Sequence, residues 1–144
     1  MIYNASPKVV TKPWGKELWL ELNDRYCYKR IYLKAGTRTS YQYHEYKIET
    51  NYIIEGEAEV WLENENGGIE KIMMKANDIF NVRPPQKHRV IAKTDVILQE
   101  VSTPEVDDVI RIEDDSARGS GKIESEHKRI LSGDVLPKKK SNKV

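Results

Sequence analysis

The sequence is poor in cysteine and histidine, and it contains no long apolar run. Cys27 is the only cysteine among 144 residues, which excludes an intrachain disulfide. The N-terminal residues MIYNASPKVV lack the apolar stretch of a signal peptide. No segment approaches the roughly 20 apolar residues that cross a bilayer. We therefore expect a reduced, cytoplasmic protein without a membrane partner.

An excess of charge of one sign is also missing, although charged residues are abundant. Lys and Arg number 24, Asp and Glu number 23, and the formal net charge is +1. Such a balance creates no global field that would attract nucleic acid or anionic lipid. A small-molecule ligand is therefore expected, and the length fits a single core.

Short segments rich in Val, Ile, Tyr and Trp fill the chain from about residue 16 to residue 113, with Gly, Pro, Asn and Asp between them. In the clearest of them, residues 57–63, Ala58, Val60 and Leu62 alternate with polar side chains. The residues NENGG at 64–68 favour a chain reversal into a second strand near 69–74. Many short strands without a long helix predict an all-β sandwich or closed barrel.

The composition changes after about residue 118. Residues 119–144 are mostly polar and include a run of three lysines at 138–140. We expect one domain over residues 1–118, with lead-in strands, and a partly flexible polar extension over residues 119–144. A short helix is expected near 125–131, the lysine run is interpreted as a solvated end, and His127 as a surface residue.

Four polar side chains have the spacing of a metal site. Gln42 and His44 are two residues apart, so on a strand both project from the same face. A turn near residues 46–47 would bring Glu49 beside them on the next strand, and His88 arrives from a separate segment. Imidazole, carboxylate and amide ligands suit Zn, Mn, Fe, Co or Ni. We predict one divalent metal ion held by these four residues, with open positions for water or substrate oxygens.

The same residues resemble a known motif. Gly36, Gln42, His44, Glu49 and Gly56 match the spacing of the first cupin motif, with glutamine in place of its first histidine. Residues 77–88 are similar to the second cupin motif and keep its histidine, but not its glycines and proline. The resemblance implies a single-domain cupin, a double-stranded β-helix or jelly-roll barrel. Cupins commonly pair, so it also implies a homodimer.

The order Gln-x-His followed by Glu resembles the cupin domain of type II phosphomannose isomerases, which is also the C-terminal domain of bifunctional mannose-1-phosphate guanylyltransferases. Residues 12–15 (KPWG), 28–36 and 107–115 resemble other stretches of that family. The resemblance implies a metal-dependent aldose–ketose isomerase that acts on a sugar phosphate of the mannose 6-phosphate type.

Basic and acidic residues around the motif are candidates for the remaining roles. Arg38 and Lys47 flank the predicted ligands and suit phosphate oxygens. Glu45, Tyr46 and Lys47 are candidate catalytic residues, while Glu55 and a hydroxide on the metal are alternative bases. Two other functions stay open. One is a non-catalytic sugar- or sugar-nucleotide-binding cupin of polysaccharide metabolism, and the other is a different metal cupin such as an Fe(II) oxygenase.

Overall fold

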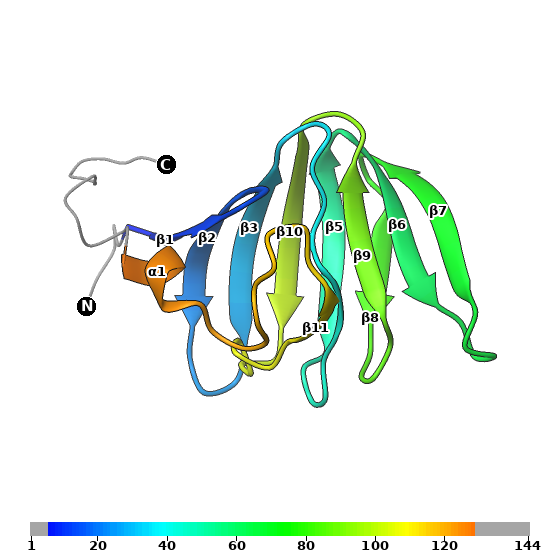
Figure 1. The fold of residues 1–144 in the computed structure, drawn as a ribbon. Coiled ribbons are helices and arrows are strands. Elements are labelled where there is room, and N and C mark those ends of the chain that lie inside the picture. Colours follow the sequence, from blue (N-terminus) through cyan, green and yellow to red (C-terminus); the bar gives the residue numbers. More distant parts are fainter. Residues whose placement is uncertain (1–5, 129–144) are drawn as a thin grey trace.

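The computed structural model describes residues 6–128, which form two antiparallel sheets that face each other (Figure 1). One sheet has the strand order β1-β2-β3-β10-β5-β8, and the other has the order β11-β4-β9-β6-β7. This arrangement confirms the predicted all-β jelly-roll barrel. In chain order the elements are β1 (Lys8–Lys12), β2 (Gly15–Leu22), β3 (Cys27–Leu33), β4 (Tyr41–Tyr43), β5 (Glu49–Glu55), β6 (Glu57–Glu63), β7 (Ile69–Lys75), β8 (Ile79–Val82), β9 (His88–Ala92), β10 (Val96–Ser102), β11 (Ile110–Glu113) and α1 (Glu124–Lys128).

The predicted hairpin at residues 57–74 is confirmed. β6 pairs with β7 over its whole length, at the end of the five-stranded sheet. Asn64 closes the turn between them, because its side-chain oxygen accepts the backbone N–H groups of Asn66 and Gly68. Turn chemistry and alternation therefore determine this part of the fold together.

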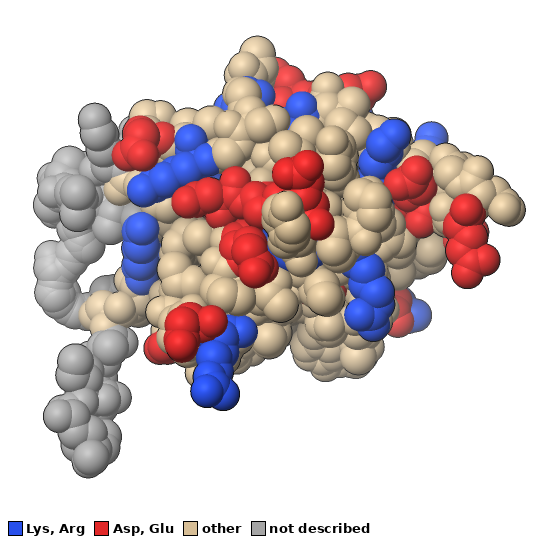
Figure 2. Space-filling model, turned by 90° about the horizontal axis from the view of Figure 1, so that it is seen from below, with Lys and Arg blue, Asp and Glu red and all other residues tan. Residues whose placement is uncertain are grey.

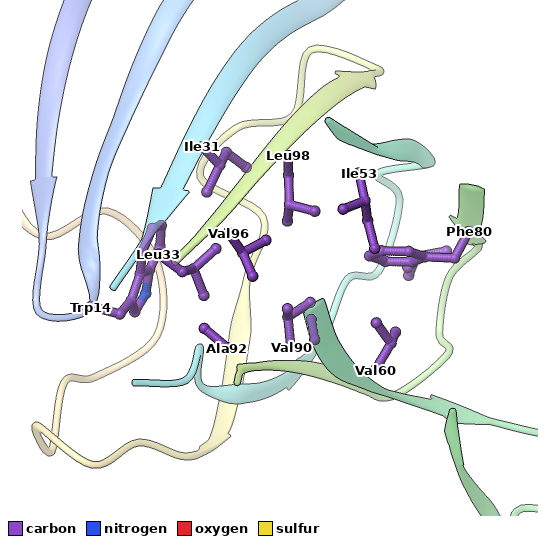
Figure 3. Close-up of a cluster of buried hydrophobic side chains, with 12 residues drawn as sticks. Trp14, Ile31, Leu33, Ile53, Val60, Phe80, Val90, Ala92, Val96 and Leu98 are labelled. Atoms are coloured by element: carbon purple, nitrogen blue, oxygen red, sulfur yellow. The ribbon is translucent and has the colours of Figure 1, made fainter. Parts of the chain in front are cut away.

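The apolar core lies between the two sheets (Figure 3). It is built from alternate residues of several strands, whose other side chains point outward. Burial of these side chains from water is the main term that holds the sheets together. The core comprises Trp14, Ile31, Leu33, Ile53, Ala58, Val60, Phe80, Val82, Val90, Ala92, Val96 and Leu98.

The inward face of β3, β10 and β5 changes from apolar to polar along the strands. Ile31, Leu98 and Ile53 are cross-strand neighbours, and all three are buried. One step along the same inward face, the neighbours are Lys29, Glu100 and Asn51, which are also buried. The barrel interior therefore has an apolar half and a polar half.

The segment after β11 packs against the start of the barrel. The expected short helix is α1, which contacts β1. Lys12 Nζ lies 2.9 Å from Glu126 Oε1, and Arg118 forms ion pairs with both Asp114 and Glu126. Residues 129–144, with the lysine run, lie outside the described residues. Within residues 6–128, no helix is long and apolar enough to cross a membrane.

Candidate metal centre

Three of the four predicted ligands converge in the polar half of the barrel. His44 follows β4, Glu49 begins β5 and His88 begins β9, and all three side chains are buried. One potential ligand atom of each residue lies within 4.8 Å of the others. The imidazole rings are 4.9 Å apart between centroids, and His44 Nε2 lies 3.1 Å from Glu49 Oε2. This group can hold a metal ion.

Backbone carbonyls fix the orientation of both imidazoles. His44 Nδ1 lies 2.6 Å from the carbonyl oxygen of Asp108, and His88 Nδ1 lies 3.0 Å from that of Gln86. Because a carbonyl oxygen only accepts hydrogen bonds, Nδ1 carries the proton in each neutral ring. The lone pair is then on Nε2, and a hydrogen-bonded Nδ1 is the usual arrangement in metal-binding histidines.

One nitrogen atom in this group, His44 Nε2, lacks a hydrogen-bond partner and is placed to bind a cation. His44 Nε2 is buried and makes no hydrogen bond, although it faces a carboxylate oxygen of Glu49. Two lone pairs that face each other at this distance repel unless a positive charge lies between them. A divalent ion with nitrogen and oxygen ligands satisfies both atoms, so the residues fit a metal.

Gln42, the fourth predicted ligand, lies on β4 directly opposite His88 on β9. Its side chain lines the same cavity as the three buried residues. Gln42 therefore lines the same cavity as His44, as the two-residue spacing predicted. Its ligation of a metal stays a prediction.

Neighbouring groups keep the Glu49 carboxylate ionised. Asn51 donates a hydrogen bond of 3.0 Å to Oε1, and Lys47 Nζ lies 3.3 Å from Oε2. Burial alone would raise the pKa of Glu49, but the charge of Lys47 holds it well below its ordinary value. Burial lowers the pKa of His88 to about 4, so this imidazole is neutral at pH 7. Both are in the ionisation state that a metal ligand requires.

Lys47 has a different environment from the one expected. The sequence suggested a residue that grips phosphate, but its side chain is buried, and Nζ also lies 3.1 Å from Glu100 Oε2. Burial works against its charge, yet Glu100 and Glu49 together raise the pKa of Lys47 above the ordinary value. Burial and the charge of Glu49 raise the pKa of Glu100. Lys47 therefore balances two interior carboxylates.

The other candidates from the sequence lie away from this cavity. Glu45 and Tyr46 are in the loop between β4 and β5, where Tyr46 is 71% exposed. Arg38 forms a two-pronged ion pair with Asp115, with Nε and Nη2 each donating at 2.8 Å. None of these three side chains lines the cavity that contains the histidines.

Asp108 positions the loop that carries His44, and sequence reasoning missed this role. Its carboxylate accepts the backbone N–H groups of Glu45, Tyr46 and Lys47, while its carbonyl oxygen holds His44. Figure 2, which shows the molecule from below, has acidic side chains gathered near the centre of this face. In the sequence, Asp108 stands out only as part of residues 107–115, which resemble another stretch of the type II phosphomannose isomerase family.

The cavity around these residues has a volume of about 110 Å³. Among the charged residues that also line it are two buried carboxylates that the sequence did not single out, those of Glu17 and Glu100. The segment after β11 also contributes to its wall. His127, expected at the surface, is half-buried there and packs edge-on against Trp19 with 5.4 Å between ring centroids.

Comparison with known proteins agrees with this architecture. The family model described as mannose-6-phosphate isomerase C-terminal matches residues 4–114. No curated protein matches the chain. A RmlC-like cupin from Shewanella frigidimarina is 24% identical with a TM-score of 0.58, and the match covers 68% of this chain and 84% of that one.

Two larger proteins share the fold over part of their length. The capsular polysaccharide assembling protein CapF from Staphylococcus aureus has a TM-score of 0.63 at 15% identity, covering 74% of this chain and 34% of its own. A tryptophan-to-phenylalanine variant of oxalate decarboxylase from B. subtilis has a TM-score of 0.66 at 15% identity, and the match covers 78% of this chain and 33% of that one. The chain thus spans about a third of each of these two proteins, and the likeness shows a cupin fold.

Proposed function

Since the chain belongs to the mannose-6-phosphate isomerase C-terminal family, we propose that it is a metal-dependent aldose–ketose isomerase that acts on a sugar phosphate of the mannose 6-phosphate type. The observation that carries the proposal is the pair of buried imidazoles beside Glu49, with both Nδ1 atoms held by backbone carbonyls. This arrangement supports a metal site inside a cavity where a small molecule can be bound.

His44, Glu49 and His88 would hold the metal, with Gln42 as the fourth ligand. A bound divalent ion supplies a Lewis acid that polarises a carbonyl oxygen and the neighbouring hydroxyl oxygen. Around it, Lys47 keeps Glu49 anionic, and the Asp108 carbonyl keeps the His44 ring in one orientation.

Glu100 is the group that we assign to proton transfer. Isomerisation between an aldose and a ketose moves a proton between adjacent carbon atoms, which requires a base that can later donate the proton. Glu45 and Tyr46 lie outside the cavity, whereas the Glu100 carboxylate lines it and is not among the grouped ligands. Burial raises the pKa of Glu100, which brings its carboxylate closer to the strength of a base that works near neutral pH.

Turnover by metal-loaded protein tests the proposal. We expect conversion of mannose 6-phosphate to fructose 6-phosphate, and a decrease in kcat of at least about 100-fold in the Glu100→Gln variant, with the metal content unchanged. Glu45→Gln is the matched control, because that residue is exposed in the loop beside His44, and its kcat should equal that of the parent. No conversion by metal-loaded parent protein would contradict the proposal.

A second function is favoured by one observation. The ammonium group of Lys47 already provides a positive charge to the carboxylates of Glu49 and Glu100. Such a site can remain stable without metal and bind a sugar without converting it. Binding of mannose 6-phosphate by metal-free protein with the parent affinity, without turnover after metal loading, would support this sugar-binding cupin instead.

A further inference from the structure

A group of basic side chains lies on the cavity wall that the segment after β11 helps to form. Arg111 on β11, with Lys122 and His127 farther along the chain, lines the same cavity as the histidines and Glu49. Lys122 and His127 lie beyond residues 4–114, which match the family model. We propose that Arg111, Lys122 and His127 form a subsite for the phosphate group of a sugar phosphate, an inference that rests on the proposed function.

Strand register places Arg111 at a suitable distance from the candidate metal ligands. Arg111 on β11 is opposite Gln42 on β4, which in turn is opposite His88 on β9. Residues in such a row point to the same face of a sheet, and two strand spacings amount to about 10 Å. This separation is comparable with that between the carbonyl end and the phosphate of an open-chain hexose phosphate. One molecule can therefore contact both ends of the row.

The guanidinium of Arg111 lacks an acidic partner. Its Nη1 atom donates to the backbone carbonyls of Gly119 and Gly121, and no carboxylate within residues 6–128 forms an ion pair with it. Its Nε atom is buried and makes no hydrogen bond. A buried donor without an acceptor destabilises the folded state, and phosphate oxygens are strong acceptors for a guanidinium. Arg111 thus has both a free charge and a free donor.

Two other basic side chains on this wall, Lys12 and Arg118, already form ion pairs, whereas Lys122 is only weakly paired. Lys12 is paired with Glu126, and Arg118 is paired with Asp114 and Glu126. Lys122 Nζ has a weaker contact of 3.7 Å with Glu124, whose side chain is 69% exposed. Screening by water makes such a surface pair weak, so Lys122 can exchange it for a phosphate oxygen.

His127 completes the proposed subsite. Its Nδ1 atom is buried and makes no hydrogen bond, while its ring rests against Trp19. Burial and the positive charges of Lys8 and Lys122 lower the pKa of His127, so positive potential accumulates here. Asp107 also lines the cavity, but it is exposed to water. An anion would relieve the repulsion between the cations and accept a hydrogen bond from Arg111 Nε, and His127 would donate to it in the tautomer that carries its proton on Nδ1.

Ligand binding by metal-loaded full-length protein tests the subsite. Isothermal titration with mannose 6-phosphate, inorganic phosphate and mannose should show that Lys122→Gln weakens the two phosphate ligands about tenfold and leaves mannose unchanged. Lys93→Gln is the matched control, because Lys93 is an exposed lysine outside the cavity. A second measurement needs no variant: mannose 6-phosphate should protect Lys122, but not Lys93, from an amine-reactive label.

The outcomes separate the subsite from the isomerase reaction. Two results together would overturn the subsite. The first is that Lys122→Gln and Lys93→Gln bind the phosphate ligands with equal affinity, and the second is that mannose 6-phosphate does not reduce the labelling of Lys122. If mannose 6-phosphate binds, protects Lys122 and is not converted, the proposed function fails while the subsite stands. If it is converted with the same KM in Lys122→Gln as in the parent, the function stands and the subsite fails.

Discussion

Lys47 Nζ lies 3.3 Å from Oε2 of Glu49, the same oxygen atom that faces Nε2 of His44 at 3.1 Å. The buried ammonium and the candidate metal site therefore share one carboxylate. A cation bound between Glu49 and the histidines would share that carboxylate with Lys47, whose second partner is Glu100 at 3.1 Å. This sharing makes the stability of the barrel and its affinity for metal depend on each other.

Replacement of Lys47 by methionine tests that dependence. Lys47→Met would leave the carboxylates of Glu49 and Glu100 buried without their cation, so we expect the free energy of unfolding to fall by about 3 kcal/mol in metal-free protein. Added Zn²⁺ or Mn²⁺ should restore part of the loss, because a bound ion stabilises the folded state. Urea unfolding with and without metal measures both effects. A loss no larger than that of Lys93→Met, an exposed lysine, would contradict the role of Lys47.

The pH dependence of stability should reflect Glu17. Its carboxylate is buried beside Lys29, with 3.2 Å between Oε1 and Nζ. Burial alone would raise its pKa, but the charges of Lys29 and Lys12 lower the pKa of Glu17 from 4.5 to about 2. Between about pH 2 and pH 4.5, the unfolded chain therefore binds more protons than the folded chain. The contribution of Glu17 is fully present above pH 4.5 and is lost as pH falls toward 2, by at most about 1.4 kcal/mol per pH unit.

Unfolding measured at several pH values between 5 and 2 can isolate this contribution. Stability of the parent should fall more steeply with decreasing pH than that of Glu17→Gln, which cannot take up the proton. Glu21→Gln changes an exposed glutamate on the same strand and should keep the parent slope. Equal slopes in all three proteins would show that Glu17 titrates alike in the folded and unfolded states.

Two glycines of the recognised motif should respond differently to alanine. Gly36 has φ of +83° with no atom within 4 Å of an added Cβ, whereas at Gly56 φ is +96° and the Cβ would lie 2.1 Å from the carbonyl oxygen of Asp95. Gly36→Ala should cost about 1–2 kcal/mol through backbone strain alone. Gly56→Ala adds a backbone clash and should cost more, as measured by urea unfolding. Equal costs would mean that the chain near Asp95 moves freely.

The homodimer expected from the cupin resemblance has a matching surface on the six-stranded sheet. Tyr28 on β3, Val101 on β10 and Thr50 on β5 are cross-strand neighbours on the outer face, and Val101 is 49% exposed. Gln99 and Tyr52, which are opposite each other, lie beside them. Exposed apolar faces of this kind suit protein interfaces. We predict a dimer by light scattering at micromolar concentration and a monomer for Val101→Glu. A parent protein that is monomeric under these conditions would contradict this prediction.

The sequence predicted strands and the closeness of Gln42 to His44 because both depend on local spacing, while metal ligation by the predicted set stays a prediction. Alternation located the strand at 57–63, and the two-residue spacing placed Gln42 and His44 on one wall. The sequence did not predict that charged side chains are buried inside the barrel. Lys29 and Glu100 share parity with buried Ile31 and Leu98, which was the available signal, but a charged residue in a strand is usually exposed.

Contacts between distant parts of the chain could not be predicted from one sequence. Lys47 follows the metal motif, and only the meeting of β5 with β10 shows that Glu100 is its second partner. His127 lies in a polar segment, and its burial depends on the packing of α1 on β1 and of its ring on Trp19. Arg38 was selected for its closeness to the motif in sequence, yet Asp115, 77 residues away, holds it outside the cavity.

Metal content after loading is the most direct test of the proposed metal centre. Purified protein is incubated with a divalent ion, passed through a desalting column and analysed by mass spectrometry for metal per chain. We predict one tightly bound ion in the parent and in Lys93→Gln, and loss of that ion in both His44→Ala and His88→Ala, because each substitution removes one ligand. Retention of the parent metal content by both histidine variants would contradict the assignment of the metal to this site.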